Sequence, residues 1–172
     1  MVLIPAVCDA VSIPVIAAGG IADGRGMVAA FTLGAEGVQV GTRFLTAEEC
    51  CIAQAYKDKV VAAKDSDTIV TGRPGGHPVR GLKNKLTREI RQMEAQGKGD
   101  SDEAEQRLAG SLRRAVQGDV DYGSMMAGQS ACLVHDIKPA QDIINDLISE
   151  AQNWAGRDMQ AMANSNATRS WK

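Results

Sequence analysis

The chain has 172 residues, of which 44% are hydrophobic and 23% charged, and its formal net charge at neutral pH is −2. This composition is typical of a globular protein. The lack of a basic excess, together with an aromatic content of only 3%, argues against a surface for nucleic acids. No apolar run approaches the roughly 20 residues of a membrane span, and the first residues lack the basic start and long apolar stretch of a secretory signal. We therefore expect a cytoplasmic protein that binds neither nucleic acid nor membrane.

The cysteines show neither a C-x-x-C spacing nor a cluster with other metal ligands. Such isolated cysteines are typical of reduced thiols in a reducing compartment. We therefore predict four free thiols and no metal site. The residues are Cys8, Cys50, Cys51 and Cys132.

The first part of the chain alternates short helices with short apolar strands. A helix is predicted over 3–10, and a strand over 14–18. This strand is continuously apolar, which favours burial on both faces in a parallel sheet. Asp23 is the expected N-cap of a helix that runs to about residue 33, and Gly34 is its expected C-terminal stop.

A second strand and helix follow. Val38 to Gly41 reads as a short strand, and Thr46 with Glu49 has the spacing of a capping box that opens a helix to about Ala63. Strands and helices that alternate in this way predict a βαβ unit in a parallel sheet, and therefore an α/β protein.

Beyond residue 67 the pattern becomes mostly helical. A strand is expected over 68–71, followed by a loop rich in glycine and proline to Pro78. The last helix is expected to begin at Pro139, and an unstructured tail from about Gly156. Helices are predicted over 81–96, 104–116 and 124–134. The last helix carries an apolar stripe made of Ile143, Ile144, Leu147, Ile148, Ala151 and Trp154.

Glycines stand directly after both predicted parallel strands. A bound phosphate needs backbone N–H groups that no Cβ shields, ideally at the start of a helix. Gly19-Gly20 and Gly41-Thr42 fit this need, and the loops after the last two strands of (β/α)8 barrels form such phosphate sites. A single Gly-Gly is more often a tight turn, but the second pair one βα unit later favours a phosphate site. Arg43 either adds charge there or pairs with a carboxylate.

The amino-acid sequences of these segments resemble those of one protein family. The run IPVIAAGGIADGRGMVAAFTLGAEGVQVGTRF is similar to the nitronate monooxygenase (2-nitropropane dioxygenase) family, whose relatives include the flavin-dependent enoyl-acyl-carrier-protein reductase II. The segments 76–90 and 118–144 resemble the C-terminal region of that family. The resemblance covers about residues 3–150. The sequence of residues 76–90 is closer to the reductase branch than to the nitronate branch.

The resemblance implies the C-terminal part of a (β/α)8 TIM barrel, with the last two parallel strands and a mostly helical region after them. It implies domains over 1–66, which would hold the FMN phosphate, and 67–155, followed by a flexible tail over 156–172. Gly19 and Gly20 match the glycines after strand seven, and Gly41 and Thr42 match the pair after strand eight. Two further residues are implied near the cofactor, Gln39 at the ligand end of the barrel and Gln129 beside the flavin. Gln129 fits a hydrogen bond between helices equally well.

The catalytic histidine of the family lies in a glycine-rich loop that nothing in residues 1–13 matches. His77 follows the barrel strands, so we expect it to be structural or to line the substrate mouth, and His135 to be solvated. Met93 and the Met125-Met126 pair are expected to pack in the core. We therefore predict no catalytic residue in this chain.

Three functions remain open. The leading one is FMN-dependent reduction of enoyl thioesters by NAD(P)H in fatty-acid synthesis, and the second is oxidation of alkyl nitronates by FMN and O2. The third is a catalytically inactive half-barrel or an interaction fragment. Two strands alone leave sheet edges without partners, so we expect a chain that is poorly stable alone. Its expected partners are a small molecule or acyl thioester, and a second copy of the full-length enzyme or a separate N-terminal half.

Overall fold

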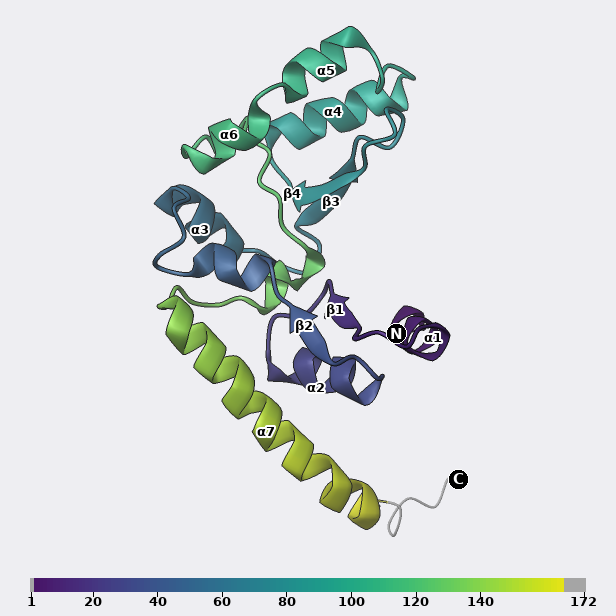
Figure 1. Ribbon diagram of the computed structural model, residues 1–172. Coiled ribbons are helices and arrows are strands. Elements are labelled where there is room, and N and C mark those ends of the chain that lie inside the picture. The colour runs from purple at the N-terminus through teal and green to yellow at the C-terminus, as the bar shows by residue number, and fades with distance from the viewer. Residues whose placement is uncertain (1, 166–172) are drawn as a thin grey trace. The chain divides into compact units, whose positions relative to one another are not determined.

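The computed structural model describes residues 2–165. The chain divides into two compact units. Unit 1 contains the residues up to Val40 and those from Gln141 onward, and unit 2 contains Gly41–Ala140. Figure 1 shows the helices and strands of both units with their labels.

Unit 1 contains a parallel βαβ arrangement, which confirms the α/β prediction. Its strands are β1 (Ile16–Ala18) and β2 (Gly37–Gln39), which pair in parallel with Ala17 opposite Val38. The connecting helix is α2 (Gly24–Thr32). The other helices are α1 (Leu3–Ala10), as predicted, and α7 (Ala140–Ser165), whose first residue belongs to unit 2.

Local signals at both ends of α2 act as predicted. The Asp23 carboxylate accepts a hydrogen bond from the backbone N–H of Gly26 at 3.0 Å and caps the helix. Gly34 lies just beyond the helix with a φ of 100°, a left-handed conformation that glycine adopts without strain. The helix therefore begins and ends at residues that the sequence identifies.

The core of unit 1 is small. It gathers Ala17, Ile21, Ala30 and Ala35, with Ile4, Val38 and Val40 packed against them. The expectation that the first strand is buried on both faces is wrong, because Ala17 alone is buried in β1 and Ile16 is 56% exposed. Among the residues that the structure describes, β1 pairs with β2 only, so its second edge and outer face have no cover.

The last helix is longer than predicted and less deeply buried. It continues to Ser165, ten residues into the region expected to be a tail, while residues 166–172 lie outside the described part of the chain. Half of its predicted apolar stripe is buried, namely Ile143, Leu147 and Ala151, and the other half is exposed, namely Ile144, Ile148 and Trp154.

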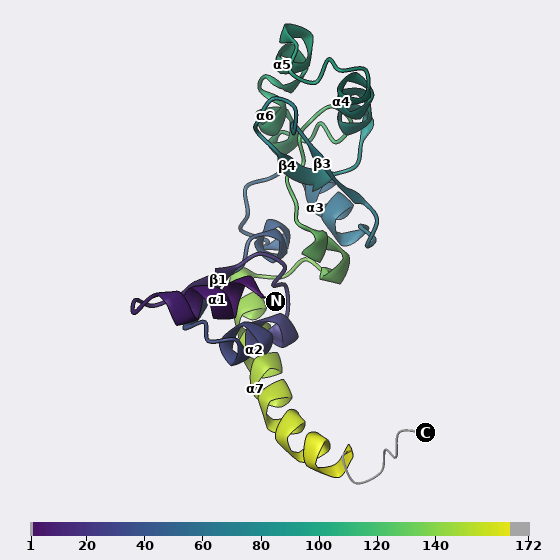
Figure 2. The same cartoon turned by 90° about the vertical axis from the view of Figure 1, so that its right-hand side faces the viewer.

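Unit 2 combines a β-hairpin with short helices. The hairpin joins β3 (Thr68–Thr71) and β4 (Val79–Leu82) in antiparallel register. Both views show α4, α5 and α6 beside this hairpin (Figure 1, Figure 2). The helices are α3 (Gln54–Val61), α4 (Lys85–Ala95), α5 (Asp102–Leu108) and α6 (Ser111–Val116), with 3-10 helices η1 (Thr42–Thr46) and η2 (Gln129–Leu133).

Two helices of unit 2 start later than the sequence predicts. The helix expected from Gly81 begins at Lys85, because residues 79–82 form β4 and Asn84 makes the capping box. The capping box expected at Thr46 is absent. The Thr46 hydroxyl donates to the carbonyl of Arg43 instead, and α3 begins only after Ala53.

Two other predicted helices are interrupted. The helix expected over 104–116 breaks at Gly110, whose φ of 66° separates α5 from α6. The helix expected over 124–134 does not form before Gln129, and residues 124–128 have an extended backbone instead. The carbonyl of Met125 accepts a hydrogen bond from Leu82 N at 2.8 Å, and Gly81 bridges to Met126. Pairing with β4 outweighs helical propensity in this segment.

No helix within residues 2–165 is both long and apolar enough to cross a bilayer.

Candidate functional site

The two glycines after β1 adopt left-handed backbone conformations. Gly19 has a φ of 101° and Gly20 a φ of 77°, values that side-chain-bearing residues rarely adopt. Both residues are exposed, and a Cβ on either would meet no atom within 4 Å. Glycine is therefore needed here for its backbone conformation, and the space beside these residues can receive a ligand.

The two parallel strands end in register. Ala18 is opposite Gln39, so the chain leaves both strands at the same edge, through Gly19 on one side and Val40 on the other. Gln39 is the last residue of β2 and is exposed. Gly19, Gly20 and Gln39 thus belong to unit 1, while Gly41, Thr42 and Gln129 belong to unit 2. A single phosphate site made of both sets stays a prediction.

The N-terminus of α2, which follows Gly19-Gly20, already binds two carboxylates. The N–H of Gly24 donates to Glu150 Oε2 at 2.9 Å, and that of Gly26 donates to Asp23. Burial opposes ionisation of Asp23, but hydrogen bonds from the Arg25 side chain and from Gly26 N–H outweigh it and lower its pKa. Protein carboxylates therefore bind the Gly24 and Gly26 amides at the helix start, and the predicted anion contact depends on the amides of the Gly19-Gly20 turn.

In unit 2, Thr42 is held by a distant segment. Its hydroxyl oxygen accepts a hydrogen bond from the backbone N–H of Gly128 at 2.9 Å. Since a hydroxyl has one proton and two lone pairs, the Thr42 proton stays available for another acceptor. Gly41 is exposed, and a Cβ there would meet nothing within 4 Å. The Gly41-Thr42 pair therefore fits an anionic ligand such as a phosphate. Gln129 follows Gly128 as the first residue of η2, and its side chain is exposed.

Arg43 pairs with a carboxylate, which decides between its two predicted roles. It is only 7% exposed, and its guanidinium donates to Asp136 Oδ1 at 2.6 Å, to the Asp136 carbonyl at 3.0 Å and to Thr46 Oγ1 at 2.6 Å. Burial opposes ionisation of Asp136, but the hydrogen bond from Lys138 and the charge of Arg43 outweigh it and lower its pKa. Arg43 therefore fixes η1, the helix that Thr42 opens.

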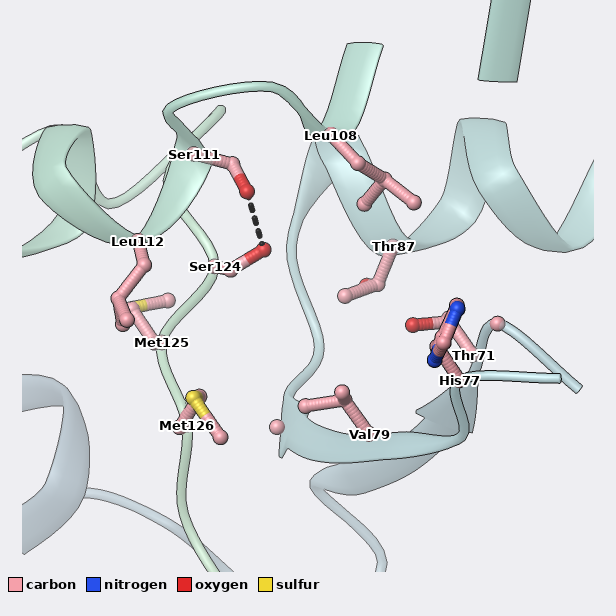
Figure 3. A pocket seen from close by; sticks show the side chains of 12 residues that line it. Thr71, His77, Val79, Thr87, Leu108, Ser111, Leu112, Ser124, Met125 and Met126 are labelled. Atoms are coloured by element: carbon pink, nitrogen blue, oxygen red, sulfur yellow. Dashed lines mark hydrogen bonds between the residues drawn. The ribbon is translucent and has the colours of Figure 1, made fainter. Parts of the chain in front are cut away.

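Unit 2 also contains a cavity of about 240 Å³. Figure 3 shows Leu108 and Val79 approaching it from opposite sides, with His77 and Thr71 at one end and Met126 at the other. The hydroxyls of Ser111 and Ser124 lie 2.8 Å apart in a hydrogen bond. His77 thus lines the cavity, and its expected place at a substrate mouth stays a prediction.

The loop that carries His77 is fixed from two directions. Gly72 has a φ of 82°, its carbonyl accepts a hydrogen bond from His77 N at 3.0 Å, and its N–H donates to Glu94 Oε1 at 2.6 Å. A Cβ on Gly72 would lie 2.4 Å from the His77 carbonyl oxygen. The loop between β3 and β4 is therefore closed on itself and attached to α4.

Sequence reasoning missed most of this cavity, although it indicated that His77 could line a substrate mouth. Val79 falls between the loop expected to end at Pro78 and the helix expected from Gly81, and Met125 and Met126 are expected to pack in the core. Met125 is indeed buried, but Met126 is half-exposed and lines the cavity. Val79-Arg80-Gly81-Leu82 does not alternate between apolar and polar residues, so the second strand of the hairpin has no clear signal in the sequence.

Within the described residues, no group of three or more His, Cys, Asp or Glu side chains could hold a metal ion. The four cysteines are free thiols.

Comparisons with known proteins agree with one another. The family model described as nitronate monooxygenase matches residues 1–150. A curated "probable nitronate monooxygenase" of Staphylococcus aureus is 40% identical over 152 residues, which are 86% of this chain and 41% of that protein. FabK from Thermotoga maritima is 50% identical with a TM-score of 0.86, over 91% of this chain and 50% of that one. A nitroalkane oxidase from Streptomyces ansochromogenes is 27% identical with a TM-score of 0.71, over 88% of this chain and 43% of that one.

The fold and its similarity to these solved structures define an α/β protein. The chain belongs to the nitronate monooxygenase family, whose model covers most of its length. It spans about 41% of the length of the curated relatives that it matches and about half of the solved FabK chain.

Proposed function

We propose that this chain is the C-terminal part of a (β/α)8 barrel and contributes the phosphate-binding end of an FMN site to an enoyl-thioester reductase. The parallel pair β1–β2 with its connecting helix supports the barrel assignment, since sequential parallel strands joined by helices build such barrels. The positive φ angles of Gly19 and Gly20 directly after β1 are the observation that carries the FMN site.

The proposed contacts divide between phosphate and ring. The amides of Gly19, Gly20 and Gly41 and the hydroxyl of Thr42 would hold the phosphate, because all are exposed or free to donate. Gln39 and Gln129 would lie nearer to the flavin ring. When bound, FMN supplies the transfer of a hydride from NAD(P)H to the β-carbon of the enoyl thioester. The chain itself anchors the phosphate and shapes a substrate cavity in unit 2.

The identities favour the reductase. The chain is 50% identical to FabK but 27% identical to the nitroalkane oxidase, over similar shares of its length. The curated matches at 40% identity are probable nitronate monooxygenases, which supports the alternative of nitronate oxidation by FMN and O2. A different class of function is an inactive half-barrel that acts by association, and the exposed Ile16 in β1 supports it.

The cofactor proposal is tested by titrating the full chain with FMN and, separately, with riboflavin, which has the same ring but no phosphate. Quenching of flavin fluorescence reports binding. Charged hydrogen bonds to a phosphate are worth about 1.5–3 kcal/mol each, so FMN should bind at least about tenfold more tightly than riboflavin. Equal affinities, or no quenching with FMN, would contradict the phosphate site.

The reaction is tested by two assays on the FMN-loaded chain. Oxidation of NADH that depends on a crotonyl thioester supports the reductase. Consumption of O2 with propionate-3-nitronate supports the monooxygenase. Absence of both activities in a chain that binds FMN supports the non-catalytic alternative.

A further inference from the structure

We propose that the cavity beside the β3–β4 hairpin binds the unbranched acyl chain of a thioester, with the polar part of the ligand near His77. The choice of a thioester rests on the proposed function. The binding of an apolar chain rests on the cavity alone, as the following observations show.

The side chains around the cavity favour an apolar ligand. Val79, Leu108, Leu112 and Met126 supply aliphatic and thioether surface. Four residues with hydroxyls also line it, namely Thr71, Thr87, Ser111 and Ser124, and the last three form hydrogen bonds within the protein. Ser111 and Ser124 bond to each other, and Thr87 Oγ1 bonds to the backbone of Asn84. A polar ligand would compete with these hydrogen bonds, whereas an alkyl chain gains from burial and leaves them intact.

The volume of the cavity is suited to one part of a ligand and is too small for a complete ligand molecule. At about 240 Å³, the cavity is smaller than the roughly 300–1,000 Å³ that encloses a complete drug-sized molecule. No phenylalanine, tyrosine or tryptophan lines it, and the ring of His77 lies at one end of the cavity. Methionine and leucine side chains adapt to flexible partners, which suits an alkyl chain of medium length.

The polar end of the ligand has its own place. A second cavity of about 350 Å³ shares Gly72, His77 and Leu108 with the first, and its other side is lined by Asp100, Ser101 and Glu105. Two carboxylates repel a phosphate and accept hydrogen bonds from an amide N–H. The chemistry of this end therefore fits a neutral headgroup with amide N–H groups, such as the pantetheine part of an acyl thioester.

Binding is tested with two neutral thioesters of N-acetylcysteamine, octanoyl and butanoyl, titrated calorimetrically into the full chain. Each buried methylene contributes about 0.8 kcal/mol, so even partial burial of the longer chain should make octanoyl bind at least about tenfold more tightly. Substitutions of Val79, which lines the cavity, and of Val116, which does not, provide a matched pair of variants. Val79→Trp should fill the cavity and weaken octanoyl binding about tenfold, whereas Val116→Trp, at a valine with the same 37% exposure that does not line the cavity, should leave it unchanged.

A second readout keeps the test decisive if Val79→Trp does not fold. With methyl-labelled methionine, octanoyl thioester should shift the resonances of Met125 and Met126, which line the cavity, and leave Met27 in unit 1 unchanged. Equal affinity for both chain lengths, or unchanged Met125 and Met126 signals at saturation, would overturn the inference. Thioester binding without FMN binding would support the inference while removing the proposed cofactor. FMN binding without a chain-length preference would support the proposed cofactor site and overturn the inference about the cavity.

Discussion

The backbone N–H of Gly128 donates a hydrogen bond to the hydroxyl of Thr42, across 86 residues of sequence. The bond fixes the rotamer of Thr42 and leaves its proton to point elsewhere. A Cβ on Gly128 would lie 3.3 Å from the same oxygen, so the two residues are in close contact. Any ligand bound by Thr42 is therefore coupled to the segment that carries Gln129.

Thr42→Val removes the hydrogen bond from Gly128 and the hydroxyl proposed to bind the phosphate, while keeping the shape of the side chain. The N–H of Gly128 loses its partner, which costs about 1–2 kcal/mol of unfolding free energy, and FMN affinity should fall about tenfold. Thr42→Ser retains the hydroxyl and should stay close to the wild type in both respects. Flavin quenching and urea unfolding measure the two effects. Unchanged FMN affinity in Thr42→Val would remove Thr42 from the site.

Gly72→Ala should distort the loop that carries His77. The residue has a φ of 82°, and the added Cβ would lie 2.4 Å from the His77 carbonyl oxygen. The left-handed conformation alone costs about 1–2 kcal/mol, so we expect a loss of about 2 kcal/mol or more in urea unfolding. Gly75→Ala is the control in the same loop, because its Cβ meets nothing within 4 Å. Similar stabilities of the two variants would contradict the closed loop.

Two glycines of α2 should respond to alanine with opposite signs. A Cβ on Gly24 would lie 2.3 Å from the backbone nitrogen of Ala151 in α7, so Gly24→Ala should cost about 2–3 kcal/mol by forcing the helices apart. A Cβ on Gly26 meets Ile21 at 3.4 Å, an ordinary contact. Gly26→Ala should therefore stabilise the helix by about 0.5–1 kcal/mol. Thermal unfolding followed by circular dichroism tests both, and destabilisation by Gly26→Ala would show that the N-terminus of α2 has no room.

The Asp136 carboxylate should make stability depend on pH. Its pKa is lowered in the folded chain, so the unfolded chain binds the proton more readily. The stabilisation is complete above the unfolded pKa, near 3.9, and is lost as the pH falls through the lower folded pKa. Asp136→Asn should thus be less stable than the wild type at pH 7, by about 1 kcal/mol because solvent screens the partly exposed pair.

The difference between Asp136→Asn and the wild type should shrink as the pH falls below about 3.9, as urea midpoints at pH 7, 4.5 and 3 would show. Asp65→Asn, at an exposed aspartate in the turn before β3, measures the effect of removing one negative charge. A difference that persists unchanged at pH 3 would mean that Asp136 acts through packing and not through its charge.

Local signals predicted the elements that depend on neighbours in sequence. Asp23 caps α2 and Gly34 ends it, and the chain between β1 and β2 folds as the βαβ pattern indicates. Prediction failed where distant segments compete for the same groups. Glu49 has capping-box spacing, but its carboxylate accepts a hydrogen bond from Ala140 N, 91 residues away.

The candidate site divides in the same way. The turn at Gly19-Gly20 was predictable because it needs only two glycines after a strand. The cavity was not, because its lining comes from the hairpin, three helices and the extended segment that contains Met125. The bridge between Gly81 and Met126 brings these parts together, and no local pattern in either segment indicates that pairing.

The hydrogen bond from Gly24 to Glu150 joins groups 126 residues apart, which has a consequence for the order of folding during synthesis. β1, α2 and β2 are translated long before the carboxylate that closes the start of α2. Contacts of such large sequence separation form late and slowly. Until α7 has been translated, the small core around Ala17 must persist as an incomplete intermediate, exposed to proteases and to association with other nascent chains.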